Sequence, residues 1–108
     1  DPHIERLKSV LKYIETHYMS SISIDEISAV SGFSASHFMR FFKKHMNMTC
    51  VEYVNNVRLE KAVELFEQGN TSILEVSLSV GFHNLSYFHR AFKNKYGMTP
   101  RSFIKELK

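Results

Sequence analysis

Two arginines lie fifty residues apart, and each is followed three residues later by a lysine: Arg40 with Lys43, and Arg90 with Lys93. An arginine guanidinium presents its N–H donors in a rigid fork, which matches guanine O6 and N7 in a major groove and also matches phosphate. A lysine is a point charge on a flexible stem, which suits phosphate. The pairs therefore indicate contact with nucleic acid. A phosphate contact or a surface salt bridge stays open as the alternative for each arginine.

Carboxylates are missing from the two stretches that hold these residues. None of the eleven Asp and Glu residues lies between Phe33 and Val51 or between Val76 and Lys105. Eight of the fourteen Lys and Arg residues lie there: Arg40, Lys43, Lys44, Arg90, Lys93, Lys95, Arg101 and Lys105. Because a solvated helix face normally mixes charge signs, two acid-free stretches favour nucleic acid as the partner.

Helical spacing of apolar residues, with caps at the ends, predicts about seven helices and no strand, so we expect an all-α fold. The expected helices cover about 2–18, 23–32, 34–46, 50–68, 72–81, 84–96 and 100–107. Gly32, Asn47, Gly69, Gly81 and Gly97 are the expected stops, because glycine and asparagine tolerate the left-handed conformation after a helix. The expected buried residues are Ile4, Leu7, Leu11, Ile14, Tyr18, Ile27, Val30, Phe38, Phe41, Phe42, Val54, Val57, Leu65, Phe66, Phe88, Ala91, Phe92 and Tyr96.

The stretch from Ile24 to Val54 repeats later in the chain. The offset is 49 residues up to Phe33, and it becomes 50 from Ser34 because His83 is an insertion. Each copy is a short capped helix, a tight turn with glycine and a longer helix, which is the layout of a helix-turn-helix unit. An ordinary helical hairpin would show the same layout. The expected division is a first unit at about 3–48, a linker helix at about 50–68 and a second unit at about 72–107.

With these residues in place, the chain resembles the DNA-binding domain of the AraC/XylS family of bacterial transcription regulators, from about Ile4 to Phe103. The most specific match is Val80-Gly81-Phe82, Ser86-Tyr87-Phe88, Arg90, Phe92-Lys93 and Gly97-Met98-Thr99-Pro100. Arg58-Leu59, Ala62 and Leu65 fit the family's linker helix. Ser28, Ser77, Asn47 and Cys50 depart from its usual residues. The resemblance implies two helix-turn-helix units that read adjacent major-groove segments of double-stranded DNA. It also implies RNA polymerase as a partner of the full-length protein.

The candidate contact residues are those on the outward faces of the two longer helices. Expected base contacts are Ser36, Met39, Arg40, Leu85, Ser86, His89 and Arg90; expected phosphate contacts are Ser34, Lys43, Lys44, Asn84, Lys93 and Asn94. Ser34 and Asn84 are helix caps first, and phosphate contact follows from the N–H groups at a helix start. For Ser36, Met39, Ser86 and His89 simple exposure is an equal alternative, and Leu85 could instead pack on the neighbouring turn.

No catalytic or metal-binding constellation accompanies these residues. The six histidines contain no i, i+4 pair, and Cys50 is the only cysteine. We therefore expect no enzyme activity, no cofactor and no metal, although the position of Cys50 at a helix start could lower its pKa. The alternative class is a helical protein-interaction module that docks partners on a Phe-rich surface.

The chain begins with Asp1-Pro2 and contains no apolar run long enough for a membrane span. We expect a fragment of a longer cytoplasmic protein, monomeric by itself and not attached to a membrane. The expected linker helix would be roughly 28 Å long, which suits one monomer on two unlike half-sites. Inserting about five base pairs between the half-sites should therefore weaken binding.

Overall fold

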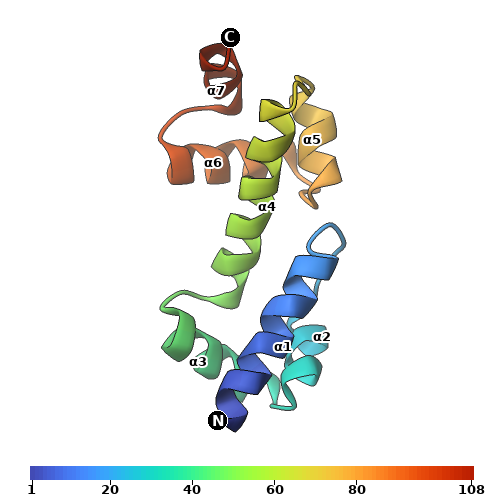
Figure 1. Cartoon of the computed structure of the whole chain (residues 1–108), viewed down its shortest axis with the longest axis vertical. Coiled ribbons are helices and arrows are strands. Elements are labelled where there is room, and N and C mark those ends of the chain that lie inside the picture. The colour runs from blue at the N-terminus through green and yellow to red at the C-terminus, as the bar shows by residue number, and fades with distance from the viewer. The chain divides into compact units, whose positions relative to one another are not determined.

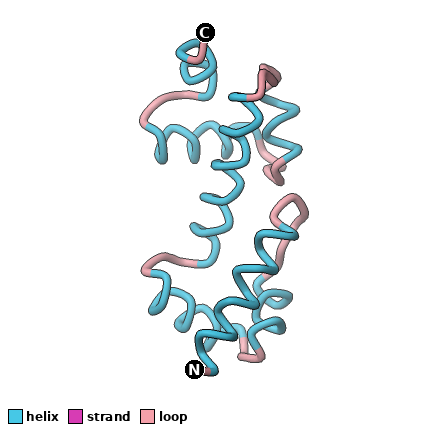
Figure 2. Tube along the Cα trace, in the orientation of Figure 1, coloured by secondary structure: helices cyan, strands magenta, loops and turns pink.

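The computed structural model describes all 108 residues. Seven α-helices connected by loops and turns make up the chain, without any strand, so the predicted all-α fold is confirmed (Figures 1 and 2). The helices are α1 (Pro2–His17), α2 (Ile24–Ser31), α3 (Ala35–Met46), α4 (Cys50–Glu67), α5 (Ile73–Ser79), α6 (Leu85–Tyr96) and α7 (Pro100–Glu106). None of them is long and apolar enough to cross a membrane.

The helix boundaries follow the capping residues. A side-chain oxygen accepts a hydrogen bond from a backbone N–H of the first turn at Asp1, Ser23, Ser34, Ser72, Asn84 and Thr99. This satisfies N–H groups that have no partner inside the helix. At the other end, α5 stops at Ser79, two residues before the predicted stop at Gly81. Gly81 adopts φ +108° in the turn that follows, so the positive φ expected for a turn glycine is present.

The chain forms two compact units, which we call unit 1 (Asp1–Val54) and unit 2 (Asn55–Lys108). Helix α4 contributes its first five residues to unit 1 and the rest to unit 2. Each unit has its own core. Buried side chains include Val10, Ile14, Ile27, Phe38 and Phe42 in unit 1, and Leu59, Ala62, Val76, Phe88 and Phe92 in unit 2.

The core differs from the prediction at several positions. Ile4 is 50% exposed although it fits the apolar stripe of α1, and Val10, which was not predicted, is fully buried. Leu65, Ala91 and Tyr96 are half-buried rather than buried, whereas Leu59 and Ala62 are buried. The spacing of apolar residues indicates which face of a helix is turned to the core. How deeply each side chain is covered depends on neighbouring helices that the local pattern does not contain.

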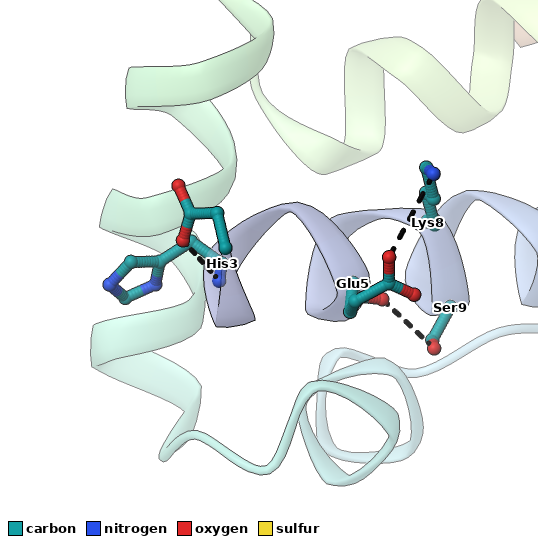
Figure 3. A network of polar contacts seen from close by, with 5 residues as sticks. His3, Glu5, Lys8 and Ser9 are labelled. Atoms are coloured by element: carbon teal, nitrogen blue, oxygen red, sulfur yellow. Dashed lines mark hydrogen bonds and ion pairs between the residues drawn. The ribbon is translucent and has the colours of Figure 1, made fainter.

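The outer face of α1 mixes charge signs, as expected. The Lys8 ammonium lies 3.8 Å from the Glu5 carboxylate, and the Ser9 hydroxyl donates to the Glu5 carbonyl (Figure 3). His3, in the first turn of the helix, lies against α3, with its ring centre 5.8 Å from that of Phe41. Helix α1 therefore contributes a solvated face along its length and one histidine to the surroundings of α3.

The structural repeat extends further than the sequence repeat, because α1 and α4 occupy equivalent places in their units. At an offset of 52 residues, Arg6-Leu7 matches Arg58-Leu59. The Arg6 guanidinium lies 4.6 Å from the centre of the Phe33 ring, and that of Arg58 lies 6.0 Å from the centre of Phe82. Unit 1 thus contains α1, α2, α3 and the start of α4, and unit 2 contains the rest of α4 with α5, α6 and α7. In each unit an arginine of the first helix contacts the phenylalanine in the turn before the longer helix.

Candidate nucleic-acid interface

Helices α3 and α6 begin and end with equivalent capping residues. The Ser34 hydroxyl accepts from the backbone N–H of His37 at 3.2 Å, and the Asn84 carboxamide accepts from that of Tyr87 at 2.9 Å. Asn47 and Gly97 end the two helices with φ +59° and +76°. The predicted exchange of asparagine for glycine after the first of these helices is confirmed.

Phenylalanines fix the rotation of both helices about their axes. Phe38 and Phe42 in α3, and Phe88 and Phe92 in α6, are fully buried. Because residues three and four apart share one face of a helix, the opposite face of each helix is turned to solvent. The exposed residues of α3 and α6 therefore lie at matching positions in the two units.

Six of the seven predicted base-contact residues are exposed: Ser36, Met39, Arg40, Leu85, Ser86 and Arg90. The exception is His89, which is half-buried, with its ring edge-on to Phe88 at 6.3 Å. His89 lies at the side of the exposed face of α6 rather than on its centre. Neither Arg40 nor Arg90 has an ion pair within the chain, so the salt-bridge alternative for them is not realised.

All six predicted phosphate-contact residues are exposed: Ser34, Lys43, Lys44, Asn84, Lys93 and Asn94. The sequence predicts that Lys95 is a cation without a competing carboxylate, and this prediction is wrong. Its ammonium lies 3.7 Å from the Glu60 carboxylate of α4. The stretch around Lys95 is free of acids in sequence, but the fold brings one to it.

An apolar hollow of about 260 Å³ lies beside α3 in unit 1. It is lined by Ile24, Met39, Arg40, Lys43, Thr49, Cys50 and Val51. Met39 and Val51 are about half exposed and form part of its apolar wall. Unlike Ser36, one turn earlier on α3, Met39 can therefore make apolar contact with a group that approaches the helix, such as a thymine methyl.

A second hollow, of about 420 Å³, lies on the other side of Arg40. It is lined by His3, His37, Arg40, Phe41, Lys44 and His45. No carboxylate is among these residues. The spacing of the six histidines in the sequence predicts no metal site, and the structure contains no group of three or more His, Cys, Asp or Glu residues that could hold a metal ion. That spacing does not show that three of the histidines gather at one hollow. The signal that could have revealed this cluster is the placement of His37, Arg40, Lys44 and His45 on one side of one helix.

Cys50 does not have the lowered pKa that its position at a helix start suggested. Its side chain is buried, and burial raises the pKa of the thiol to about 11. Desolvation disfavours the thiolate and outweighs the helix N-terminus. Burial also lowers the pKa of the Arg58 guanidinium beside Phe82, but arginine remains charged at neutral pH.

The chain matches known proteins over most of its length. A family model described as a helix-turn-helix domain matches residues 27–106. An HTH-type transcriptional regulator of Bacillus subtilis, YdeC, is 35% identical over 100 residues, which cover 93% of this chain and 34% of YdeC. The chain spans about a third of the length of YdeC and of two further curated relatives, the Msm operon regulatory protein of Streptococcus mutans and PocR of Salmonella typhimurium, at 34–36%.

Solved structures share the fold. A probable AraC family transcriptional regulator from Rhodopseudomonas palustris superimposes with a TM-score of 0.86 at 26% identity, covering 96% of this chain and 98% of that one. The DNA-binding domain of AdpA, solved in complex with a target DNA, superimposes with a TM-score of 0.85 at 21% identity, covering 98% and 92% of the two chains. The latter likeness is one of fold.

Proposed function

Because the chain belongs to the AraC-type family of helix-turn-helix domains, we propose that it binds double-stranded DNA in a sequence-specific manner. Helices α3 and α6 each enter a major-groove segment. Within the longer protein this domain supplies the DNA-binding part of a bacterial transcription regulator. That protein works in the cytoplasm and contacts RNA polymerase, while the domain by itself is a monomer.

The observation that carries the proposal is the equivalence of Arg40 and Arg90. Both are exposed at the same position of equivalent helices, on faces without acids, and neither is paired within the chain. An unpaired guanidinium that projects from a groove-sized helix suits bidentate contact with guanine. The complex of AdpA with DNA supports the proposal, because that domain has the same fold.

The remaining residues divide by their chemistry. Ser36, Met39, Leu85 and Ser86 provide hydrogen bonds and apolar contacts to base edges beside the two arginines, and His89 contributes from the side. Lys43, Lys44, Lys93 and Asn94 contact phosphates, and Ser34 and Asn84 add to the anion affinity of the two helix N-termini. Phosphate contacts give affinity and register, and base contacts give sequence preference.

The alternative, a helical protein-interaction module, loses its main support in the structure. The phenylalanines that were to form its docking surface are mostly in the cores: Phe38, Phe41, Phe42, Phe66, Phe82, Phe88 and Phe92 are at most 5% exposed. Phe33 and Phe103 are half-buried. No Phe-rich surface remains to dock a helix.

The test is a selection of duplexes from a random pool, followed by anisotropy titrations of the selected site and a scrambled duplex. We expect the selected site to bind roughly a thousandfold or more tighter than the scrambled duplex. The logarithm of affinity should fall linearly with the logarithm of salt concentration. Equal affinity for both duplexes would contradict sequence-specific binding, and no binding at low salt would contradict DNA binding altogether.

A further inference from the structure

The hollow beside Arg40 that holds three histidines differs in kind from the equivalent place in unit 2. We propose that His3, His37 and His45 form, with Lys44 and Arg40, a proton-dependent phosphate site that strengthens the binding of unit 1 to the DNA backbone as pH falls. The inference rests on the proposed function. It adds that one of the two units takes up protons when it binds.

Three histidines from two helices line the hollow together. His3 comes from the first turn of α1, and His37 and His45 come from the start and end of α3. The ring centre of His3 lies 6.2 Å from that of His45. Figure 3 shows the His3 ring extending from the start of α1. Histidine is the side chain that gains a positive charge most readily near neutral pH, so a hollow lined by three histidines suits proton-dependent binding of an anion.

The local contacts of the histidines tolerate protonation. His45 Nδ1 lies 3.0 Å from the Phe41 carbonyl oxygen, so Nδ1 is the donor and Nε2 is left to take up a proton. The His37 ring is stacked on Phe33 with ring centres 4.0 Å apart, and an imidazolium on a phenyl face is favourable. Neither contact has to break when the ring becomes charged.

Most charged groups around the histidines are positive, and they disfavour a further positive charge on the rings. A bound anion is therefore needed to stabilise the protonated histidines. Lys44 and Arg40 line the hollow from α3. From α1, the Arg6 guanidinium lies over Phe33, and the Asp1 carboxylate accepts the backbone N–H of His3. The turn after α2 contributes Phe33, which carries no charge. Glu5, the next acid along α1, is paired with Lys8. A phosphate in the hollow would therefore favour the protonated histidines.

Unit 2 has no such site, because each histidine is replaced by a group already committed to a partner. Asn55 stands where His3 stands, and its side chain donates to the hydroxyl of Tyr87, the counterpart of His37, at 2.8 Å. Lys95, the counterpart of His45, is paired with Glu60. Proton uptake is therefore expected from unit 1 and not from this part of unit 2.

The test is an anisotropy titration of a fluorescein-labelled mixed-sequence duplex at about pH 6 and about pH 8, at constant ionic strength. Each proton taken up on binding strengthens it by up to about tenfold per pH unit, so we expect about fivefold or more tighter binding at the lower pH. The salt dependence should also be steeper there, because more positive charge faces phosphate. Inorganic phosphate, titrated as a competitor, shows whether the hollow holds a free anion or needs the DNA backbone.

The triple variant H3N/H37Q/H45Q should lose most of this pH dependence, and the single variant H37Q should lose part of it. Thermal melts of both at each pH show whether they are folded. His17→Gln is the matched control, because His17 is an exposed histidine of α1 that stacks on Tyr13 away from the hollow. It should keep the full pH dependence.

Two results would overturn the proposal while leaving DNA binding intact. One is unchanged pH dependence in a folded triple variant, which would assign the proton to His83 or His89 of unit 2. The other is wild-type affinity that is the same at both pH values. Absence of binding at every pH and at low salt would instead refute the proposed function on which the site depends.

Discussion

Arg6 joins the first helix of unit 1 to the turn before α3 through its contacts at Ser31 and Phe33. Its guanidinium donates a hydrogen bond to the Ser31 carbonyl and lies 4.6 Å from the centre of the Phe33 ring. A carbonyl near the end of α2 that lacks a partner within the helix is thereby satisfied. The turn that sets the start of α3 is thus supported by a residue 25 or more positions earlier in the chain.

This contact makes Gly32 more sensitive to substitution than Gly97, although the two have nearly the same φ, +78° and +76°. A Cβ at Gly32 would lie 2.6 Å from Arg6 Nη1, whereas a Cβ at Gly97 meets nothing within 4 Å. Gly97→Ala should cost about 1–2 kcal/mol in free energy of unfolding from backbone strain alone. Gly32→Ala should cost more, because Arg6 must leave its hydrogen bond.

Urea denaturation of Gly32→Ala, Gly97→Ala, Arg6→Ala and the double variant R6A/G32A tests this account. In the double variant the collision is gone, so its cost should be smaller than the sum of the costs of Arg6→Ala and Gly32→Ala. Strict additivity, or equal costs for Gly32→Ala and Gly97→Ala, would show that Arg6 does not restrain the turn.

The two exposed arginines should contribute sequence preference. Arg40→Ala and Arg90→Ala should each weaken binding to a selected site by about 1–3 kcal/mol and relax the preference at a different base position. Lys93→Ala is the control, since loss of a phosphate contact should weaken binding to selected and scrambled duplexes alike. If either arginine variant loses the same affinity on both duplexes, that arginine contacts phosphate.

Release of Lys95 from Glu60 should increase the affinity for DNA. In Glu60→Gln the ammonium of Lys95 loses its partner at 3.7 Å and becomes available to phosphate. The slope of log affinity against log salt should steepen by up to about 0.9, the value for one added phosphate contact. Stability should change by less than about 1 kcal/mol, because the Glu60 side chain of this ion pair is 65% exposed.

Glu64→Gln provides the matched comparison for that change. Glu64 lies on the same helix and pairs with Lys61, so its replacement alters the net charge equally while leaving Lys95 bound to Glu60. A slope that steepens equally in both variants would trace the effect to net charge and not to Lys95.

The buried thiol of Cys50 should make stability fall at high pH. Its pKa rises from an ordinary value of 9.0 to about 11 in the folded chain, so the folded state holds the proton more tightly than the unfolded state. The stabilisation is complete below pH 9 and is lost as pH rises towards 11, by on the order of 2 kcal/mol. Denaturation curves at several pH values should show a shallower decline in Cys50→Ala than in the wild type.

Tyr96 must be considered in the same measurement, because burial and the charges of Glu60 and Glu67 raise the pKa of its hydroxyl to about 12. Its contribution falls at higher pH than that of Cys50. Tyr96→Phe should therefore leave the decline between pH 9 and 10 in place. A wild type whose stability is flat up to pH 11 would contradict the burial of Cys50.

The features that could be predicted from the sequence are those that depend only on residues close to one another in the chain. Ser34 and Asn84 were identified as caps, and Asn47 and Gly97 as stops, because capping is decided within four residues. The pair of Lys95 with Glu60 and the burial of Val10 depend on contacts between helices, which no local pattern contains. The equivalence of α1 and α4 was missed for a related reason. Apart from Arg6-Leu7 and Arg58-Leu59, α1 and α4 share few residues at equivalent positions. A buried position can be filled by different apolar side chains, so the sequence repeat does not extend to these helices.

Helix α4 belongs to both units, since unit 1 ends at Val54 and unit 2 begins at Asn55 within it. A cut there would leave the second half without the Thr49 cap and expose unpaired N–H groups in the middle of a helix. Unit 1 and unit 2 therefore cannot be exchanged separately, as two domains joined by a loop can. Substitutions on the exposed faces of α3 and α6 can differ between the two units, whereas a break within α4 would affect both units.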